Sequence, residues 1–257
     1  MKNLRNKFIL ILIASAIVGG LLSGCDPIYK MVKCPSYVVC YINLDVLTLR
    51  DVPSDPQCIL LRGEYDLSKG CGLHSTGAEK ERYNQLCQKH NDVSYNQKRM
   101  IGGTLDIEST AFIDCDFIEI KITADKDFDG THPAGSNLSD IVRFMSWSPY
   151  KYILSGYTQY YHYDPSDVSM EFDNLMRIYT WEGHFDQSAE NTCYPIDEPV
   201  SNLTTDDLVL LGDGEALSLL GMLYFENKPE VKDEYNITVE IKTDDDRVLT
   251  DTIKLTF

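Results

Sequence analysis

The sequence predicts a mainly β protein, more specifically an antiparallel immunoglobulin-like or Greek-key β-sandwich with short helices and long loop insertions. Apolar and polar residues alternate with a period of two in several segments, most clearly over residues 235–257. Clusters of Pro, Gly, Asp and Ser separate these segments, and patterns with a helical period are few and short. A total of about eight strands with few helices favours a sandwich over a βαβ fold.

Residues 1–24 are predicted to be a lipoprotein signal peptide. Positively charged residues precede an apolar run over residues 8–18, and Leu21–Cys25 reads Leu-Leu-Ser-Gly-Cys, the pattern of a lipobox. Cleavage before Cys25 would leave an N-terminal thiol for lipidation, so acyl chains would tether the protein to a membrane. An uncleaved transmembrane anchor is disfavoured because the apolar run is short and ends in Gly-Gly.

Residues 25–35 are predicted to be a lipidated tether, and residues 36–257 a single β-rich domain. Apolar side chains at the even positions of 38–46 predict a half-buried strand, and after a turn cluster residues 58–62 predict a second, shorter one. From about residue 63 to 98, Gly, Ser and charged residues dominate. We interpret this Cys-rich segment as an insertion on the sheet, with a polar helix or loop at 78–88.

Strand character returns at residues 100–107 and 110–123. In the second segment the apolar residues occupy odd positions up to Phe117 and even positions from Ile118, which predicts a β-bulge near Phe117.

Apolar residues at helical spacing over 138–145 predict a short helix, and Ser148-Pro149 predicts the start of another that ends near Gly156. Residues 157–200 are expected to form long loops with a strand at 175–181.

The last part of the chain is predicted to be an antiparallel hairpin. Residues 235–242 and 249–257 each alternate with apolar residues at odd positions, and a polar turn at 243–246 joins them. Residues 208–211 and 217–225 are apolar and predict two further strands before it.

Three features carry a resemblance to a known group. They are the lipobox, the segment Asp127-Phe-Asp-Gly-Thr-His-Pro-Ala-Gly-Ser-Asn-Leu-Ser-Asp140, and the hairpin sequence Thr243-Asp-Asp-Asp-Arg-Val-Leu-Thr-Asp251. Over most of residues 100–257 the chain resembles uncharacterised lipoproteins of Bacteroidetes-type bacteria. The resemblance implies an exported β-rich lipoprotein, and it implies no catalytic residues.

The chain is strongly acidic, which limits its partners. Its formal charge is −17, and removing residues 1–24 takes away three positive charges and no negative ones, which leaves −20. Nucleic acid and anionic lipid surfaces are therefore poor partners, because phosphate contacts need Lys or Arg, which this chain concentrates nowhere. Cations, neutral glycans and basic proteins fit better.

Seven of the eight cysteines remain if Cys25 carries lipid. In an oxidising compartment we expect up to three disulfides and one leftover thiol, with pairings that the sequence leaves open. Two Cys-x-x-His pairs, Cys71 with His74 and Cys87 with His90, have spacing similar to a zinc site. Export favours disulfides over zinc at these positions.

Asp125, Asp127 and Asp129 precede Gly130 with the spacing by which a tight loop wraps oxygen ligands around calcium. The closing acid is missing, because Ser136 stands at position 12 of the loop. The interpretations are a partial, weak calcium site or an acidic loop in which the Asp side chains accept hydrogen bonds from their own turn.

Six tyrosines fall between residues 150 and 163. Rings on loops suit stacking on sugars or contact with a protein, so Tyr157, Tyr160 and Tyr161 are candidate binding residues. The favoured alternative is that half of the rings cover the core.

The preferred function is a non-enzymatic, lipid-anchored binding or structural accessory module of the bacterial cell envelope. The lipobox predicts that it is anchored to the outer membrane, on its periplasmic or surface face. Its partner would be a glycan or a protein. The alternative is a hydrolase with an unrecognised acidic site. No nucleophile elbow, Walker loop or His-Glu-x-x-His motif occurs that would indicate another kind of active site. A concave pocket with converging carboxylates would favour the enzyme, and a flat aromatic patch would favour the binder.

Overall fold

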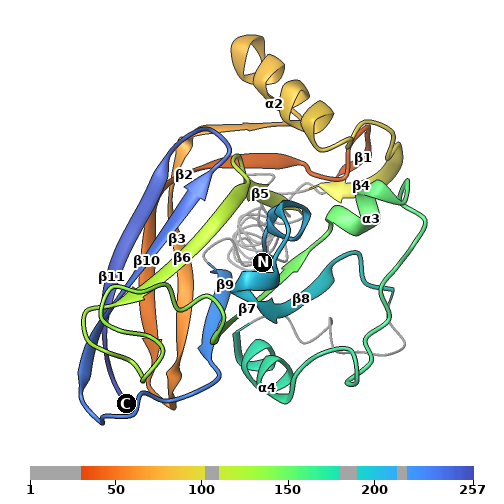
Figure 1. The fold of residues 1–257 in the computed structure, drawn as a ribbon. Coiled ribbons are helices and arrows are strands. Elements are labelled where there is room, and N and C mark those ends of the chain that lie inside the picture. The colour runs from red at the N-terminus through yellow and green to blue at the C-terminus, as the bar shows by residue number, and fades with distance from the viewer. Residues whose placement is uncertain (1–29, 102–109, 180–189, 213–218) are drawn as a thin grey trace, which may run out of the picture.

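The structure is a computed structural model that describes residues 30–101, 110–179, 190–212 and 219–257 (Figure 1). Its strands are β1 (Lys30–Cys34), β2 (Cys40–Val52), β3 (Asp55–Gly72), β4 (Gln97–Ile101), β5 (Ala111–Ile113), β6 (Phe117–Ala124), β7 (Val142–Ser148), β8 (Tyr194–Pro199), β9 (Leu219–Phe225), β10 (Glu234–Thr243) and β11 (Val248–Thr256). Its helices are α2 (Gly77–Lys89), α3 (Tyr150–Leu154) and α4 (Met170–Tyr179), with short 3-10 turns η3 (Val200–Asn202) and η4 (Thr205–Leu208).

The strands form three sheets, with the orders β1-β4, β11-β10-β6 and β5-β2-β3-β9-β7-β8. All strand pairs are antiparallel except β2 with β5. The three-stranded and six-stranded sheets face each other, and β11 runs beside β2, where the Leu49 amide donates to the Asp251 carboxylate at 2.8 Å (Figure 1). The protein is therefore mainly β, and its antiparallel sheets are consistent with the predicted β-sandwich.

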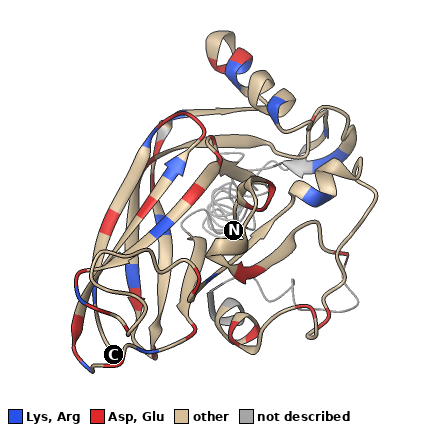
Figure 2. Cartoon of the chain, viewed as in Figure 1, with Lys and Arg blue, Asp and Glu red and all other residues tan. Residues whose placement is uncertain are grey.

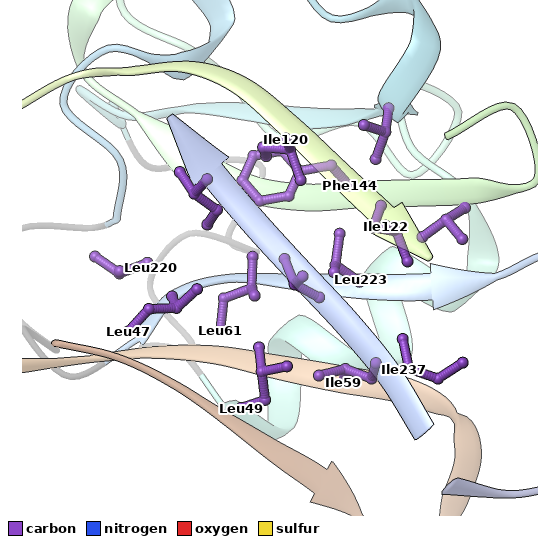
Figure 3. Close-up of a cluster of buried hydrophobic side chains, with 14 of the residues drawn as sticks. Leu47, Leu49, Ile59, Leu61, Ile120, Ile122, Phe144, Leu220, Leu223 and Ile237 are labelled. Atoms are coloured by element: carbon purple, nitrogen blue, oxygen red, sulfur yellow. The ribbon is translucent and has the colours of Figure 1, made fainter. Parts of the chain in front are cut away.

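The main core lies between these two sheets. Figure 3 shows Leu49, Ile59 and Leu61 of β2 and β3 directed toward Ile122 of β6 and Ile237 of β10. All five side chains are buried. Because each such side chain contributes roughly 1.5–3 kcal/mol when it leaves water, this layer is the principal source of stability.

The C-terminal hairpin is confirmed. β10 pairs with β11 from Glu234 opposite Thr256 to Lys242 opposite Val248. The odd-numbered side chains of β10, from Tyr235 to Ile241, are all buried. On the opposite face, charges of both signs are exposed and paired, as in the Lys121–Glu240 ion pair at 3.2 Å (Figure 2).

The bulge near Phe117 is also confirmed. The pairing of β10 with β6 shifts register between Lys242, which lies opposite Glu119, and Thr243, which lies opposite Phe117. The shift lets Phe117 and Ile120 both reach the core despite their different parity.

Three predicted elements are wrong, one of them the strand predicted at residues 208–211, which form the end of η4 and an irregular segment. Residues 142–148 form strand β7 and not a helix, because β7 is covered on both faces: Phe144 packs in the main core and Trp147 in a second cluster beneath α4. A strand buried on both sides loses the period of two. Residues 175–179 of the strand predicted at 175–181 belong to helix α4, whose buried Phe172 and Leu175 pack in the second cluster; the last two residues of that prediction lie outside the described ranges.

The segments near the N-terminus differ from their predicted bounds. Residues 30–34 of the predicted tether form β1, which pairs with β4. Residues 63–72 of the predicted insertion belong to β3, whose 18 residues continue the sheet. The polar helix predicted at 78–88 is α2, which follows β3 and projects from the end of the sheet where β2 begins and β3 ends (Figure 1). In β2, Val46 is exposed because the register shifts between Leu44 and Val46.

The expected disulfides are absent among the described cysteines. The buried thiols are spread over separate clusters: Cys115 in the main core, Cys58 in the second cluster, and Cys71 with Cys87 under α2. Burial also raises the pKa of Cys58 and Cys115 to about 12, which disfavours the thiolate that disulfide exchange requires.

Candidate functional site

A cleft of about 460 Å³ opens along β8, within the size range of ligand sites. Four consecutive residues of β8, Pro195 to Glu198, form one wall. The other lining residues come from separate segments: Lys151 in α3, Asp167 before α4, Asn202 in η3 and Asp207 in η4. A smaller hollow beside the cleft shares Lys151 and Asp207 and is lined further by Tyr150 and Tyr194.

The position of β8 at the edge of the six-stranded sheet makes the cleft possible. β8 pairs only with β7 in the described sheet, from Tyr194 opposite Ser148 to Pro199 opposite Arg143. Pro195 and Pro199 lack the backbone N–H that a further strand would need, and proline is tolerated at such an edge. The edge therefore stays open toward the cleft.

Two of the cleft carboxylates are held in place by the protein itself. Asp197 has a side chain only 5% exposed, and it lies 3.3 Å from the Arg143 guanidinium, which also donates to the Asp197 carbonyl oxygen at 2.7 Å. Asp207 caps η4 by accepting hydrogen bonds from the Thr204 amide at 2.9 Å and the Thr204 hydroxyl at 2.6 Å. Both side chains are thereby held in fixed orientations.

The other two carboxylates, Asp167 and Glu198, are exposed. Within the described part of the chain neither forms an ion pair. Lys151 is the one cation among the lining residues, and its Nζ lies 6.0 Å from the centre of the Tyr194 ring. The cleft thus combines four carboxylates and one lysine, and the Tyr194 ring lines the adjoining hollow; Figure 2 shows the acidic band on β8.

These carboxylates are not arranged to chelate one ion. No group of three or more His, Cys, Asp or Glu side chains among the described residues could hold a metal. Separate anions along one groove instead attract an extended ligand that carries positive charge and hydrogen-bond donors.

The predicted calcium ligands Asp125, Asp127 and Asp129 point to three different partners. Asp125 accepts from the Asn236 amide at 2.9 Å, and Asp127 accepts from the Ala134 amide at 2.8 Å. Asp129 accepts from the backbone and hydroxyl of Thr131, both at 2.7 Å. Asp127 and Asp129 thus bond within their own loop, as in the second interpretation, whereas Asp125 bonds to β10. The calcium site stays a prediction that the geometry does not support.

His132 sits between two acids of this loop. Its Nδ1 lies 2.9 Å from Asp129, and its Nε2 lies 3.1 Å from Asp140. The hydrogen bond with Asp129 has the largest effect and raises the pKa of His132. Burial opposes it, and the hydrogen bond with Asp140 adds to the rise. Phe128 anchors the same loop in the core, where its ring stacks 5.4 Å from that of Phe225, so this cluster has a structural role.

In the second zinc-like pair, His90 has other partners. Both ring nitrogens of His90 are engaged, with the Tyr41 hydroxyl at 3.0 Å and Asp116 at 3.0 Å. Lys89 bridges Asp116 and Asp244 at 2.6 and 2.5 Å. Burial would raise the pKa of Asp116, but His90 and Lys89 together hold it below its usual value. This buried network joins the end of α2 to the C-terminal hairpin.

The three tyrosines predicted as binding residues are buried or half-buried in the structure. Tyr157 is 7% exposed and Tyr161 is 8% exposed, while Tyr160 is half-buried. The Tyr157 hydroxyl donates to Asp92 at 2.8 Å, and the Tyr160 ring packs 5.0 Å from that of Tyr152. These rings fill the space beneath the irregular segment, as the favoured alternative proposed, and do not form an exposed stacking platform.

The acids of the cleft were missed by sequence reasoning. Asp167, Asp197, Glu198 and Asp207 lie in segments without a recognisable motif. The one available signal was Pro195 and Pro199 flanking an apolar and acidic stretch, which is the composition of an edge strand.

The predicted lipidation residue, Cys25, lies outside the described residues. Within the described ranges, no helix is both long and apolar enough to cross a membrane. No family model, curated protein or solved structure matches the chain.

Proposed function

We propose that the protein is a lipid-anchored binding module of the bacterial cell envelope and that its ligand occupies the cleft along β8. The lipobox ending at Cys25 supports the anchor, which would place the protein at the outer membrane on its periplasmic or surface face. The observation that carries the binding role is the cleft itself, a polar groove of about 460 Å³ with prearranged carboxylates.

The fixed state of these carboxylates supports binding over catalysis. A glycoside hydrolase needs one carboxyl group that is protonated at the working pH and a second that is ionised. Asp197 is paired with Arg143, and Asp207 accepts two hydrogen bonds from Thr204, so both side chains are already engaged by the protein. Carboxylates held in this way contribute negative charge to a binding site, whereas proton transfer requires a carboxyl group that is free to contact the bond to be cleaved.

A hydrolase is the second candidate, because Asp167 and Glu198 also line the cleft and could act on a bound glycan. Turnover of envelope glycans by the purified protein, abolished by Glu198→Gln, would favour this candidate over the binding module.

The proposal is tested by capturing partners from an envelope extract with immobilised protein. Wild type should retain a ligand that Glu198→Gln and Asp167→Asn retain less well. Glu119→Gln is a matched control, because Glu119 is an exposed residue of β6 outside the cleft lining. Equal capture by all four proteins would refute a role for the cleft.

The anchor is tested separately. Cys25→Ala should abolish labelling by an acyl-chain analogue and release the protein from the membrane fraction. Persistent labelling would refute lipidation at this residue.

A further inference from the structure

We infer that the cleft recognises arginine-bearing segments of a partner polypeptide through their side chains, with the guanidinium group placed among the carboxylates and against Tyr194. This inference rests on the proposed function, because it names the ligand class of the same site. Charge, the backbone of β8 and the position of Lys151 each contribute to it.

The charge of the lining selects a cation. Asp167, Asp197, Glu198 and Asp207 face one lysine, and the Arg143 guanidinium offsets only Asp197. Anions that share a groove repel one another, and a ligand cation relieves this repulsion. Because no described triad of acids can hold a metal ion, the spacing favours a cation larger than a metal.

The backbone of β8 argues against recognition by strand addition. The carbonyl groups of Ile141 and Trp147 accept from Glu226 and Gly212, on the side of β7 that faces β9. Odd-numbered residues of β7 therefore bond toward β9 and even-numbered residues toward β8, since the two directions alternate along a strand.

The same alternation applies to β8. Ser146 lies opposite Ile196, so the even-numbered residues of β8 bond to β7 and the odd-numbered residues turn their backbone outward. Of these, Pro195 and Pro199 have no N–H, which leaves Asp197 as the only outward backbone donor of β8. The Asp197 carbonyl already accepts from Arg143, so the outward acceptors of the edge are the carbonyl groups of Pro195 and Pro199. An edge with two acceptors and one donor cannot extend the sheet regularly, but it suits a side chain with several N–H donors.

The position of Lys151 indicates where such a side chain would bind. Its ammonium group lies over the Tyr194 ring at 6.0 Å and lines the same cleft as the acids. Lys151 thus occupies a position suited to a cation. Arginine fits the combination of carboxylates and an aromatic face better than lysine, because the planar guanidinium can stack and donate at the same time.

The substitution Lys151→Gln also tests the inference, because the direction in which it changes the affinity depends on the charge of the ligand. If the ligand is cationic, Lys151 competes with it, and Lys151→Gln should tighten binding. If the ligand is anionic, the same substitution should weaken binding. A purely structural role for Lys151 would leave the affinity of all ligands unchanged or lower it.

The experiment is fluorescence anisotropy with the full chain in detergent micelles and three short labelled peptides, in which Ser alternates with Arg, Gln or Glu. The Arg peptide should bind, more weakly at about 300 mM than at about 50 mM salt, and the Glu peptide should not. Glu198→Gln and Asp167→Asn should each weaken binding of the Arg peptide by about 3- to 10-fold, Lys151→Gln should strengthen it by a similar factor, and Glu119→Gln should leave it unchanged.

The inference is overturned if the Arg peptide does not bind, if Glu198→Gln binds it as wild type does, or if Lys151→Gln weakens it. These outcomes differ from failure of the proposed function. Retention of a neutral glycan from the envelope extract, lost in Glu198→Gln, would leave the binding module intact while removing arginine as its ligand. All variants alter exposed side chains, so circular dichroism should show the wild-type fold.

Discussion

Replacing Asp92 with alanine should destabilise the fold more than any surface substitution. Asp92 is fully buried, and its carboxylate accepts hydrogen bonds from the amides of Tyr37 and Val38 at 2.6 and 2.8 Å and from the Tyr157 hydroxyl at 2.8 Å. It therefore ties the Tyr-rich segment and the segment after α2 to the start of β2.

The expected magnitude follows from the donors that the substitution leaves behind. Asp92→Ala removes the acceptor of two backbone N–H groups and one hydroxyl, and each buried unsatisfied donor costs about 1–3 kcal/mol. Partial relaxation and water entry should bring the total to about 3–5 kcal/mol. Asp92→Asn keeps one oxygen, which already serves Tyr37 and Tyr157, but sets an amide N–H against the Val38 N–H. Its cost should be smaller, about 1–3 kcal/mol.

The assay is urea unfolding followed by far-ultraviolet circular dichroism on wild type and both variants. Asp164→Ala is the control, because Asp164 is exposed and accepts from Ser166 within its own turn at 2.9 Å. Its unfolding midpoint should match that of wild type. If Asp92→Ala also matched wild type, or if Asp92→Asn cost more than Asp92→Ala, the assignment of stability to these three hydrogen bonds would be wrong.

Three further outcomes are expected. The acids around His132, Asp129 first, raise its pKa, so the folded state binds this proton more tightly than the unfolded state. The resulting stability is present below the unfolded pKa of about 6.5 and is lost as pH rises through the higher folded pKa, so melting temperature should fall over this range more in wild type than in His132→Gln. Gly221→Ala should cost about 1–3 kcal/mol in chemical unfolding, because its Cβ would lie 2.6 Å from the Phe144 ring; a variant as stable as wild type would show that β7 can move aside. The thermal unfolding curves in EDTA and in millimolar CaCl₂ should coincide. A higher melting temperature in CaCl₂ that is lost in Asp127→Asn would establish the calcium site instead.

The sequence alone predicted the elements that have one face in the core and one in water. Residues 235–242 alternate because the side chains of Tyr235 and Ile237 are buried while their neighbours face solvent. The same reasoning located the bulge near Phe117, where the apolar residues change from odd to even positions. In each case the burial of successive residues follows the local period of the backbone, so the pattern is visible in a short window.

The sequence could not predict elements whose two faces are both covered. β7 meets the main core through Phe144 and the second cluster through Trp147, so its apolar residues carry no period of two. The exposure of the tyrosines was likewise undecided, because a loop tyrosine can face solvent or fill a gap, and Tyr157 does the latter.

The candidate site was decided by tertiary structure alone. Lys151, Asp167, Glu198 and Asp207 come from four segments of the chain and meet only after β8 pairs with β7 and α3 and η4 fold beside it. None of these residues forms a local motif, and an acid in a loop has the same sequence signature whether it faces bulk water or a cleft. Burial on one face leaves a periodic trace in the sequence, whereas the convergence of distant side chains depends on long-range contacts that no short window records.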